Sequence, residues 1–282
     1  MTDKEALEHQ KNLDRLRKLR PIDDDFMRCM FKDNIPLAQL VLRIIIGKPD
    51  LIITSCETQK DMKRLAGARS ICLDAYGNDP DGTKYDLEVQ RHDKGADPYR
   101  ARYHSSVLDI ENLSAGQEFH ELPETYTIFI TEKDIFGEGA PIYPVERINL
   151  QTGKPFGDGA HILYVNGSYR DDSDIGRLMH DFCCNNADDM NFSLMADRTR
   201  YLKENTKGVT EMCKILEDMC LEAKQEGRME GRMEGRMEGL VEGKQKFIRR
   251  MLNSGRYTLN EIADLSELPL DQIKQFQAEQ GL

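Results

Sequence analysis

Hydrophobic and polar positions change their spacing several times along this chain, and each change predicts a new element. Residues 1–20 are mostly charged or polar, which predicts an exposed charged helix. After Pro21, the stretch IDDDFMRCMFKD puts its apolar side chains on one helical face, behind an aspartate that can cap the helix. PLAQLVLRIIIG begins at Pro36, ends at Gly47 and is apolar almost all round, which predicts a buried core helix.

A period of two then replaces the helical spacing. LIITSCETQ (51–59), ICLDAY (71–76) and KYDLEVQ (84–90) are short β-branched or apolar stretches, which predict three strands. NDPDG (78–82) predicts a turn between the second and third strands, because its glycine can take a positive φ. TYTIFIT (125–131) is nearly continuous in apolar residues and predicts an interior fourth strand.

Helices separate and follow these strands. A helix is expected from Pro98 to about Leu113, between the third and fourth strands. INL and HILYVNG, joined by QTGKPFGDGA, predict a β-hairpin after the fourth strand, and the chain turns helical after about Ser173. The order helix–strand–strand–strand–helix–strand predicts an α/β fold, whose mixed central sheet is a meander followed by one helical crossover.

A perfect tetrapeptide repeat, GRMEGRMEGRMEG, occupies residues 227–239. In a helix it stacks like charges four residues apart, and each interior glycine costs about 1 kcal/mol relative to alanine. We interpret it as a solvated, semi-flexible helical connector. The alternative is a glycine-faced oligomerisation helix in which chains exchange Arg–Glu pairs.

The tail beyond the repeat contains LNEIADLSELPLDQI, which has helix-turn-helix spacing. Its acidic residues would repel phosphate, which favours a helical docking or dimerisation module over a DNA-reading one. The whole chain thus divides into a charged N-terminal helix (1–20), a main α/β domain (21–172), a helical extension (173–225), the repeat connector (226–243) and a small helical C-terminal module (244–282).

Charge and cysteine content narrow the class of protein. The formal net charge of −11 counts against a non-specific nucleic-acid binder, although an enzyme with an acidic metal site and a locally basic face remains compatible. The longest apolar run, LVLRIIIG, is too short to span a bilayer, and the N-terminus lacks an apolar signal region, so we expect neither membrane insertion nor export. Seven cysteines without a CxxC pair indicate reduced thiols in the cytoplasm.

Acidic residues interrupt two of the predicted strands in the stretch LDAYGNDPDGTKYDLEVQR. If the turn centres on Asp81, Asp74 lies directly opposite Glu88, and the same face also carries Asp86 and Gln90. Opposed Cβ atoms are about 4.5–5.5 Å apart, so the two acids repel each other unless a hard cation such as Mg²⁺ lies between them. The alternative is an exposed strand face, on which the acids pair with basic residues nearby, namely Lys63, Arg64, Arg69 or Arg91.

This stretch resembles the D…(D/E)xK core of PD-(D/E)XK nucleases. More closely, the chain is similar to the Rpn family of recombination-promoting nucleases, also called PD-(D/E)XK nuclease family transposases. The features of that family occur here in order as DDFMRCMF, CLDAY, YDLEVQ and YRARYHSSV. The resemblance covers about residues 20–225, and the helix–strand order matches the αβββαβ core of the superfamily. It therefore implies a restriction-endonuclease-like domain at 21–172, with a helical C-terminal extension.

In functional terms, the resemblance implies a deoxyribonuclease that uses Mg²⁺ (or Mn²⁺) to hydrolyse DNA phosphodiester bonds. Such a protein is expected to be cytoplasmic, bacterial or from a mobile element, and linked to DNA recombination. DNA is the implied partner, no membrane is involved, and the C-terminal helices are candidates for pairing copies of the chain. The alternative is a catalytically degenerate nuclease fold that serves as a binding or oligomerisation module.

Matched to the family motif, Asp74 and Glu88 are the implied catalytic, metal-binding acids. Gln90 stands where the superfamily has a lysine that orients the attacking water and stabilises charge. Glutamine can hydrogen-bond that water but brings no charge, so the chemistry must depend more on metal and arginine. Asp25 matches an acidic position on the first helix that sometimes completes the site. Its alternative role is a helix cap or a partner of the helix dipole.

The helix after the third strand matches the basic helix of the family. Arg100, Arg102 and Tyr103 are therefore implied DNA contacts, and the alternative is a solvated face with Tyr103 packed. His92 and His104 neighbour the site without a ligand-like spacing, so we expect both to be ordinary surface histidines.

Overall fold

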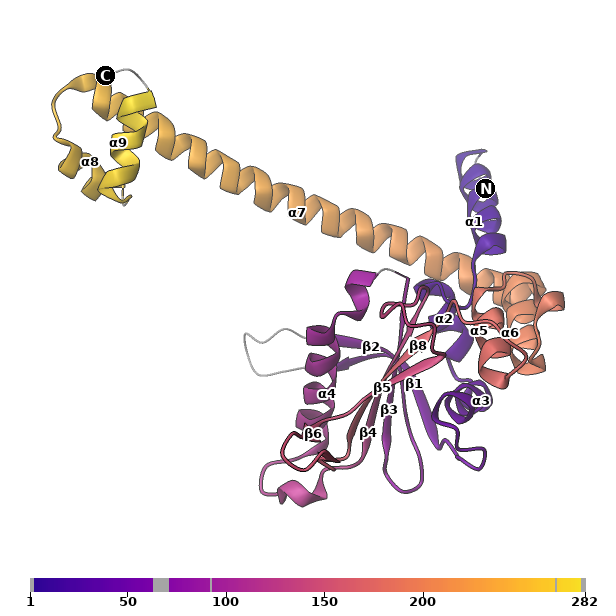
Figure 1. Ribbon diagram of the computed structural model, residues 1–282. Helices are drawn as coiled ribbons and strands as arrows, with labels where there is room; N and C mark the ends of the chain where they lie inside the picture. Colours follow the sequence, from indigo (N-terminus) through magenta and orange to yellow (C-terminus); the bar gives the residue numbers. More distant parts are fainter. Residues whose placement is uncertain (1–2, 63–70, 92, 267, 280–282) are drawn as a thin grey trace. The chain divides into compact units, whose positions relative to one another are not determined.

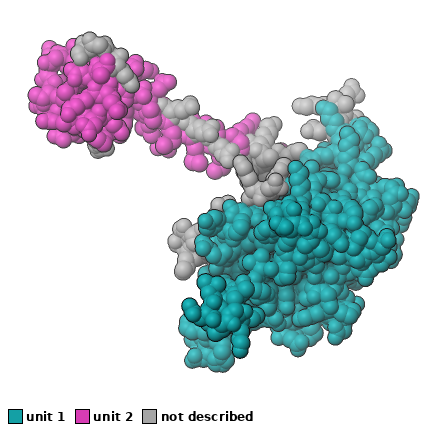
Figure 2. Space-filling model, viewed as in Figure 1, with its two compact units in different colours: residues 1–216 teal, residues 217–282 magenta. Residues whose placement is uncertain are grey.

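The structure is a computed structural model that describes residues 3–62, 71–91, 93–266 and 268–279. The chain divides into two compact units, residues 1–216 and 217–282 (Figure 2). In the described part of the chain, all strands lie in the first unit and the second unit is helical.

The first unit is built on a six-stranded mixed sheet. Its strands are β1 (Ser55–Met62), β2 (Ile71–Asn78), β3 (Lys84–Gln90), β4 (Thr125–Thr131), β5 (Ile142–Val145) and β8 (Ala160–Asn166). They lie in the order β1-β2-β3-β4-β8-β5 (Figure 1). β1, β2 and β3 form an antiparallel meander, β4 runs parallel to β3 and β8, and β5 is antiparallel to β8. The predicted α/β fold with a mixed sheet is confirmed.

Helices cover both faces of this sheet (Figure 1). The helices of the first unit before α7 are α1 (Asp3–Lys18), α2 (Asp24–Phe31), α3 (Ile35–Ile46), α4 (Pro98–Asn112), α5 (Asp174–Cys183) and α6 (Ser193–Glu204), with short 3₁₀ helices η1 (Asp93–Ala96), η2 (Phe119–Glu121) and η3 (Ala187–Asp189). α4 makes the crossover from β3 to β4 and packs on β4 and β8. The opposite face carries the main core, to which α2, α3, α5 and α6 contribute.

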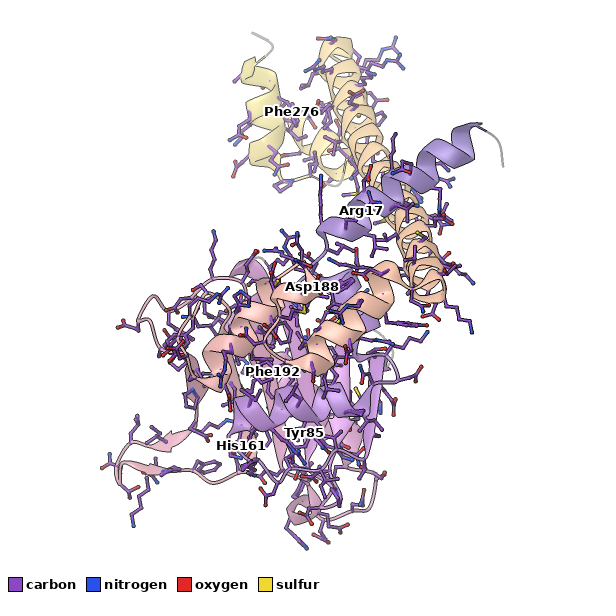
Figure 3. The ribbon with its side chains drawn as sticks, turned by 90° about the vertical axis from the view of Figure 1, so that its right-hand side faces the viewer. Arg17, Tyr85, His161, Asp188, Phe192 and Phe276 are labelled. Atoms are coloured by element: carbon purple, nitrogen blue, oxygen red, sulfur yellow. The ribbon has the colours of Figure 1, made fainter. Side chains whose placement is uncertain are left out.

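Side chains of β3 alternate between these two layers, so the strand is buried on both faces. Tyr85, Leu87 and Val89 enter the main core, and Tyr85 is among the largest fully buried side chains (Figure 3). Asp86 and Glu88 leave the strand on the other side, toward α4. One strand therefore supplies both the core and the acidic group.

Local sequence signals set the ends of the helices near this group. The Asn34 side chain accepts a hydrogen bond from Leu37 N at the start of α3, and Gly47 ends that helix with φ 72°. At the start of α4, the Asp97 side chain accepts a hydrogen bond from Tyr99 N, and a proline occupies the first helical position. These caps fix where α4 begins and so which of its residues lie over β3.

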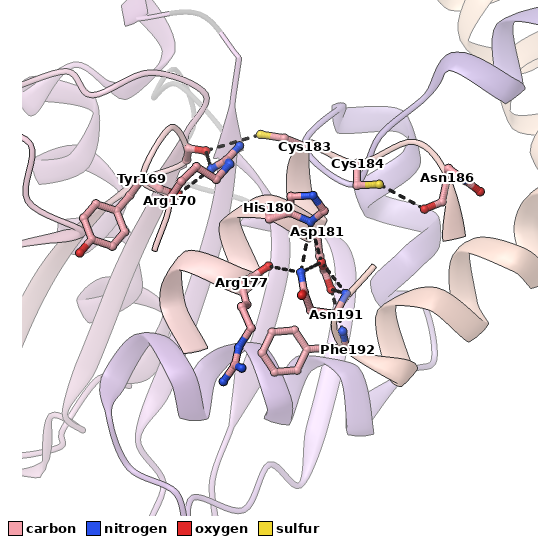
Figure 4. A network of polar contacts seen from close by, with 11 residues as sticks. Tyr169, Arg170, Arg177, His180, Asp181, Cys183, Cys184, Asn186, Asn191 and Phe192 are labelled. Carbon is pink, nitrogen blue, oxygen red and sulfur yellow. Dashed lines mark hydrogen bonds and ion pairs between the residues drawn. The ribbon is translucent and has the colours of Figure 1, made fainter. Parts of the chain in front are cut away.

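A buried carboxylate connects α5 to the start of α6. Asp181 is 0% exposed and accepts hydrogen bonds from the backbone N–H groups of Asn191 and Phe192 and from the Asn191 side chain (Figure 4). Phe192 is the residue that precedes α6, so these bonds satisfy donors that a helix start leaves free. Every oxygen of this buried acid has a protein partner.

The β-hairpin predicted from INL and HILYVNG is wrong. HILYVNG forms most of β8, which pairs with β4 and β5. INL begins with β6 (Ile148–Asn149), which pairs with β7 (Lys154–Pro155) in a separate two-stranded ribbon. The apolar β8 gains more by pairing with the interior strand β4, and an alternating pattern does not specify a strand's partner.

Two boundaries also differ from expectation. The first strand begins at Ser55 rather than at residue 51, although Leu51 and Ile53 still lie in the core. The N-terminal helix is not wholly exposed, because Leu16 and Leu19 at and after its end are 1% and 9% exposed. A few apolar side chains at one end of a charged helix are enough to anchor it.

The second unit is formed by the later part of α7 (Thr206–Ser254) with α8 (Leu259–Ser266) and α9 (Leu270–Glu279). Its buried cluster consists of Ile248, Met251, Ile262, Ala263 and Ile273. The tetrapeptide repeat lies within α7, where its methionines Met229, Met233 and Met237 are exposed. No helix in the described residues is both long enough and apolar enough to cross a membrane.

Candidate active site

The β2–β3 hairpin has the register that the turn predicted. Gly82 takes φ 90° in the turn, as its position required. Tyr76 pairs with Asp86 and Ala75 with Leu87. The predicted register is therefore confirmed, and it brings the next opposed residues of the two strands together.

Asp74 and Glu88 are the next opposed residues of the two strands, and hydrogen bonds of their side chains join the strands. The Asp74 N–H donates to Glu88 Oε1 at 3.0 Å, and the Val89 N–H donates to Asp74 Oδ2 at 3.2 Å. Asp74 is 6% exposed and Glu88 is 0% exposed. The alternative of an exposed strand face is therefore wrong, because α2 and α4 bury these carboxylates.

Two arginines from different helices lie beside the pair. Arg28 of α2 places Nη2 3.8 Å from Asp74 Oδ1, and Arg100 of α4 donates from Nη2 to Glu88 Oε2 at 3.2 Å. Of the basic residues considered as exposed partners, Arg91 pairs with other acids, whereas Lys63, Arg64 and Arg69 lie outside the described residues.

His104 of α4 lies close to both acids of β3, Asp86 and Glu88. Its Nδ1 is 3.2 Å from Asp86 Oδ2 and 3.8 Å from Glu88 Oε1. Its Nε2 is 3.3 Å from Arg100 Nε. Since a guanidinium can only donate, the hydrogen-bond network assigns Nε2 as acceptor and Nδ1 as the protonated nitrogen that donates to Asp86.

The expectation of a surface position is wrong for His104, which is 2% exposed, and His92 lies outside the described residues. The helical spacing around position 104 could have predicted that this histidine is buried. Position 104 shares a helix face with the buried Ala101, Val107 and Leu108, so its ring must face the sheet.

Burial shifts the ionisation of all four groups in this cluster. It raises the pKa of Asp86 well above its ordinary value, and the nearby Asp74 charge adds to the shift. Burial and the charges of Asp86 and Asp74 likewise raise the pKa of Glu88, and burial raises the pKa of Asp74. Burial lowers the pKa of His104, which keeps the imidazole neutral. Burial is the largest cause of all four shifts, and the charges of neighbouring acids add to it at Asp86 and Glu88.

The donor set suits a divalent cation. Asp86, Glu88 and His104 each offer a ligand atom, and these atoms lie within 4.8 Å of one another. Asp86 Oδ1 is buried and has no hydrogen-bond partner in the described part of the chain. Carboxylate oxygens are the ligands that Mg²⁺ and Mn²⁺ prefer, and a cation would relieve the excess negative charge.

Gln90 and Asp25, the two remaining predicted catalytic residues, lie apart from these contacts. The Gln90 side chain lies against Gly95 of η1, where any Cβ atom would collide with its Oε1. Asp25 Oδ2 pairs with Arg15 at 3.1 Å. The acid of α2 whose charge raises the pKa of Asp74 is instead Asp24.

The three predicted DNA contacts on α4 have different surroundings. Arg100 binds Glu88, as described above. Arg102 is exposed, and its guanidinium lies 5.5 Å from the centre of the exposed Tyr99 ring. Tyr103 is half-buried against Tyr76 and its neighbours in α4. The Arg100 side chain is still 41% exposed, so both arginines present charge to solvent.

Sequence reasoning missed the roles of Arg28, Asp86 and His104. Arg28 is the i+4 neighbour of Asp24, so both lie on one face of α2, and that spacing was visible in DDFMRC. Nothing local indicated that this face would meet β2. Asp86 was placed on the acidic face but given no function.

One family model matches this chain, that of the PD-(D/E)XK nuclease family transposases, at residues 41–168. No curated protein and no solved structure matches it. The matched segment runs from α3 to the end of β8 and includes the whole hairpin with Asp74 and Glu88 and the helix that carries Arg100. The family predicted from the motifs is confirmed by this match, in which residues 41–168 are similar to the PD-(D/E)XK nuclease family transposases.

Proposed function

We propose that this protein is a divalent-metal-dependent DNA endonuclease, associated with recombination or mobile elements. The observation that carries the proposal is the opposition of Asp74 and Glu88 at the end of the β2–β3 ladder. Both are buried, and each carboxylate is fixed by a backbone N–H of the facing strand. Similarity to a nuclease family makes phosphodiester hydrolysis the natural use of such a pair.

Asp74 and Glu88 would hold the cation, since each keeps one oxygen that no backbone N–H occupies. When bound, Mg²⁺ or Mn²⁺ supplies Lewis-acid activation of a water and of the scissile phosphate. The residues of the chain supply the rest. They fix the two carboxylates, bury them from bulk water and place two guanidinium groups beside them.

Arg28 and Arg100 are the positive charges that can replace the lysine of the superfamily. Each lies beside one acid, at 3.8 Å from Asp74 and 3.2 Å from Glu88. Both side chains are partly exposed, which leaves their outer N–H groups accessible to a phosphate. Gln90 follows the acids on β3 and, being neutral, can orient water but cannot offset charge.

DNA approach would use the exposed part of α4. Arg102 and the 73% exposed Tyr99 offer a charge and an aromatic ring at the start of that helix. Because the chain carries a net charge of −11, DNA would be bound through such local groups rather than through overall charge. Arg102 is thus proposed as a backbone phosphate contact.

A second candidate function is a non-catalytic binding or assembly module on the nuclease fold. The observation that favours it is the neutral Gln90, whose side chain lies against Gly95. The long helix α7 would then be the functional part, as a contact between copies of the chain. This candidate predicts that the protein binds DNA or associates with itself but does not cleave DNA.

Nicking of supercoiled plasmid separates the two functions. Wild type should nick in Mg²⁺ or Mn²⁺ and not in EDTA, whereas Asp74→Ala should be inactive. Asp79→Asn is the matched control, because Asp79 is also buried in this hairpin but lies in the turn, where it binds Thr83 and Tyr85. Equal nicking by wild type and Asp74→Ala, or none by either in both metals, would refute catalysis at this site.

A further inference from the structure

The cluster between β3 and α4 contains one acid that the proposed mechanism does not use. Asp74 lies beside Arg28 and Glu88 beside Arg100. Asp86 is 0% exposed, and its contact at Oδ2 is the neutral imidazole of His104. Its other oxygen has no partner in the described residues.

A second buried acid of the same type shows what a structural role looks like here. Asp181 is also 0% exposed, but its two oxygens accept bonds from Asn191 and Phe192. Burial of a carboxylate is unfavourable unless donors or a cation replace the lost water. Asp181 has those donors within the protein. Asp86 has a donor at Oδ2, from His104, but none at Oδ1 in the described residues, so its surroundings are incomplete without a further group.

We propose that Asp86 is a third carboxylate of the cation site and that His104 is the positioning residue that orients it. Asp86 would present Oδ1 to the cation that Asp74 and Glu88 hold, while Nδ1–H of His104 occupies Oδ2. The inference rests on the proposed metal dependence and adds two residues to the site besides the matched acids Asp74 and Glu88.

Distances within the cluster support one shared ion. Ligand oxygens of one Mg²⁺ or Ca²⁺ ion, each about 2.0–2.6 Å from it, lie within about 5 Å of one another. One ligand atom each of Asp86, Glu88 and His104 meets this condition, because these three atoms lie within 4.8 Å of one another. The two residues leave β3 on the same face, two positions apart.

His104 is suited to orient Asp86 rather than to bind the cation. Arg100 Nε donates to His104 Nε2 at 3.3 Å, which leaves the proton on Nδ1, 3.2 Å from Asp86 Oδ2. The ring also contacts Phe129 edge-on, with centres 5.7 Å apart. With both nitrogens engaged and the ring packed, His104 holds Asp86 through Oδ2 and leaves Oδ1 without a partner in the described residues.

The neighbouring strand adds a second unsatisfied polar atom. Thr127 pairs with Asp86 across β3 and β4, and so its side chain leaves the sheet on the same face. Thr127 Oγ1 is buried and lacks a partner in the described residues, like Asp86 Oδ1. Two such atoms, on paired residues and on one face of the sheet, favour a polar occupant such as a cation with its water.

Calorimetric titration of the full chain with Mn²⁺ tests the inference without relying on activity. Asp86→Asn keeps the size of the side chain and an oxygen for His104, and should weaken Mn²⁺ binding by at least about 10-fold. Asp79→Asn, the buried aspartate in the turn, should bind Mn²⁺ as wild type does. Asp86→Ser is the second variant if the amide disturbs folding.

Thermal unfolding supplies an independent readout. Without metal, Asp86→Asn should not lower the Tm, because the carboxyl group that it replaces is buried and one of its oxygens lacks a partner in the described residues. The upward shift of Tm on adding Mn²⁺ should then be smaller in Asp86→Asn than in wild type. A residue with a purely structural role would lower the metal-free Tm when replaced.

Replacement of His104 tests the positioning role. His104→Phe should weaken Mn²⁺ binding by about 10-fold, and His104→Gln, which retains an N–H donor, should restore part of it. Unchanged Mn²⁺ affinity in Asp86→Asn and Asp86→Ser would overturn the inference and leave the proposed function intact. Absence of Mn²⁺ binding in wild type would overturn both. Normal affinity in His104→Phe would overturn the role of His104.

Discussion

The two faces of β3 show how one strand can serve stability on one side and chemistry on the other. Leu87 and Val89 are buried among apolar side chains of the main core. Asp86 and Glu88, their neighbours in sequence, are as deeply buried among charged groups and a histidine. Burial is thus the same on both faces, but only the apolar face gains free energy from it.

The two faces of β3 also differ in whether their buried groups all find partners within the protein. On the core face, Tyr85 packs against other side chains of the protein, and its ring stacks on that of Tyr126 with centres 5.5 Å apart. The acidic face keeps a buried oxygen of Asp86 without a partner. Proteins keep such unfavourable groups at functional sites, where a ligand completes them. The difference between the faces is the physical sign of a site.

The largest expected effect comes from the acidic face. Glu88→Gln removes a negative charge that would hold the cation, so DNA cleavage should fall by about 1,000-fold. The variant keeps an oxygen that can accept the hydrogen bond from the Asp74 N–H. Its unfolding free energy should change little, because Arg100 is 41% exposed and stays hydrated when unpaired. Plasmid nicking and urea unfolding measure the two quantities. A stable Glu88→Gln variant with full activity would contradict the contrast.

The reverse result is expected one residue earlier, on the core face. Leu87→Ala should lower the unfolding free energy by about 2–5 kcal/mol, because it leaves a cavity in the main core. The molecules that remain folded should cleave DNA at a rate similar to wild type. Urea unfolding, followed by nicking assays at a temperature well below the Tm, separates the two. Greater loss of activity than of folded protein would show that the faces are coupled.

A smaller effect is expected for Arg100→Lys. Lysine keeps the charge but cannot donate to Glu88 and His104 at once in the fixed geometry of a guanidinium. The kcat for cleavage should fall by about 10-fold with little change in KM. Arg102→Lys is the control on the same helix, and it should leave kcat unchanged. Equal effects of both substitutions would mean that Arg100 acts only as a general DNA contact.

The smallest effect concerns a histidine on the core face of the sheet. His161 continues the aromatic stack beside Tyr126, with ring centres 4.6 Å apart. Partial burial alone would lower its pKa, but the carboxylates of Glu146 and Glu124, 2.7 and 2.9 Å away, outweigh it and raise the pKa above 6.5. The folded state therefore holds this proton more tightly than the unfolded state.

The stabilising effect of His161 is present below about pH 6.5 and disappears as the pH rises through the higher pKa of the folded state. Because both glutamates are partly exposed, about 0.5–1 kcal/mol is expected. The difference in unfolding free energy between wild type and His161→Gln should thus be larger at pH 5.5 than at pH 8.5, by about that amount. An unchanged difference would contradict the assignment. His104, buried on the other face, has the opposite pKa shift.

Much of the fold was predictable because its signals are local. The change from helical spacing to alternation predicted the order of elements, and Gly82 in NDPDG predicted the hairpin turn and with it the register of Tyr76 and Asp86. The partner of β8 was not predictable in this way. Pairing of distant strands depends on which apolar surfaces of the fold remain exposed. The sequences INL and HILYVNG alone do not indicate which strand each will pair with.

The sequence by itself predicted the opposition of Asp74 and Glu88, because alternation along the two strands and a turn centred on Asp81 place them opposite each other. Tertiary structure alone decided what surrounds that pair. Arg28 and Arg100 arrive from helices far apart in the chain, and His104 faces Asp86 only because α4 packs across the sheet. Local periodicity fixes the direction of a side chain relative to its own element. Which charges meet in the interior depends on how separate elements pack, and that packing created the buried, unpaired oxygen of Asp86.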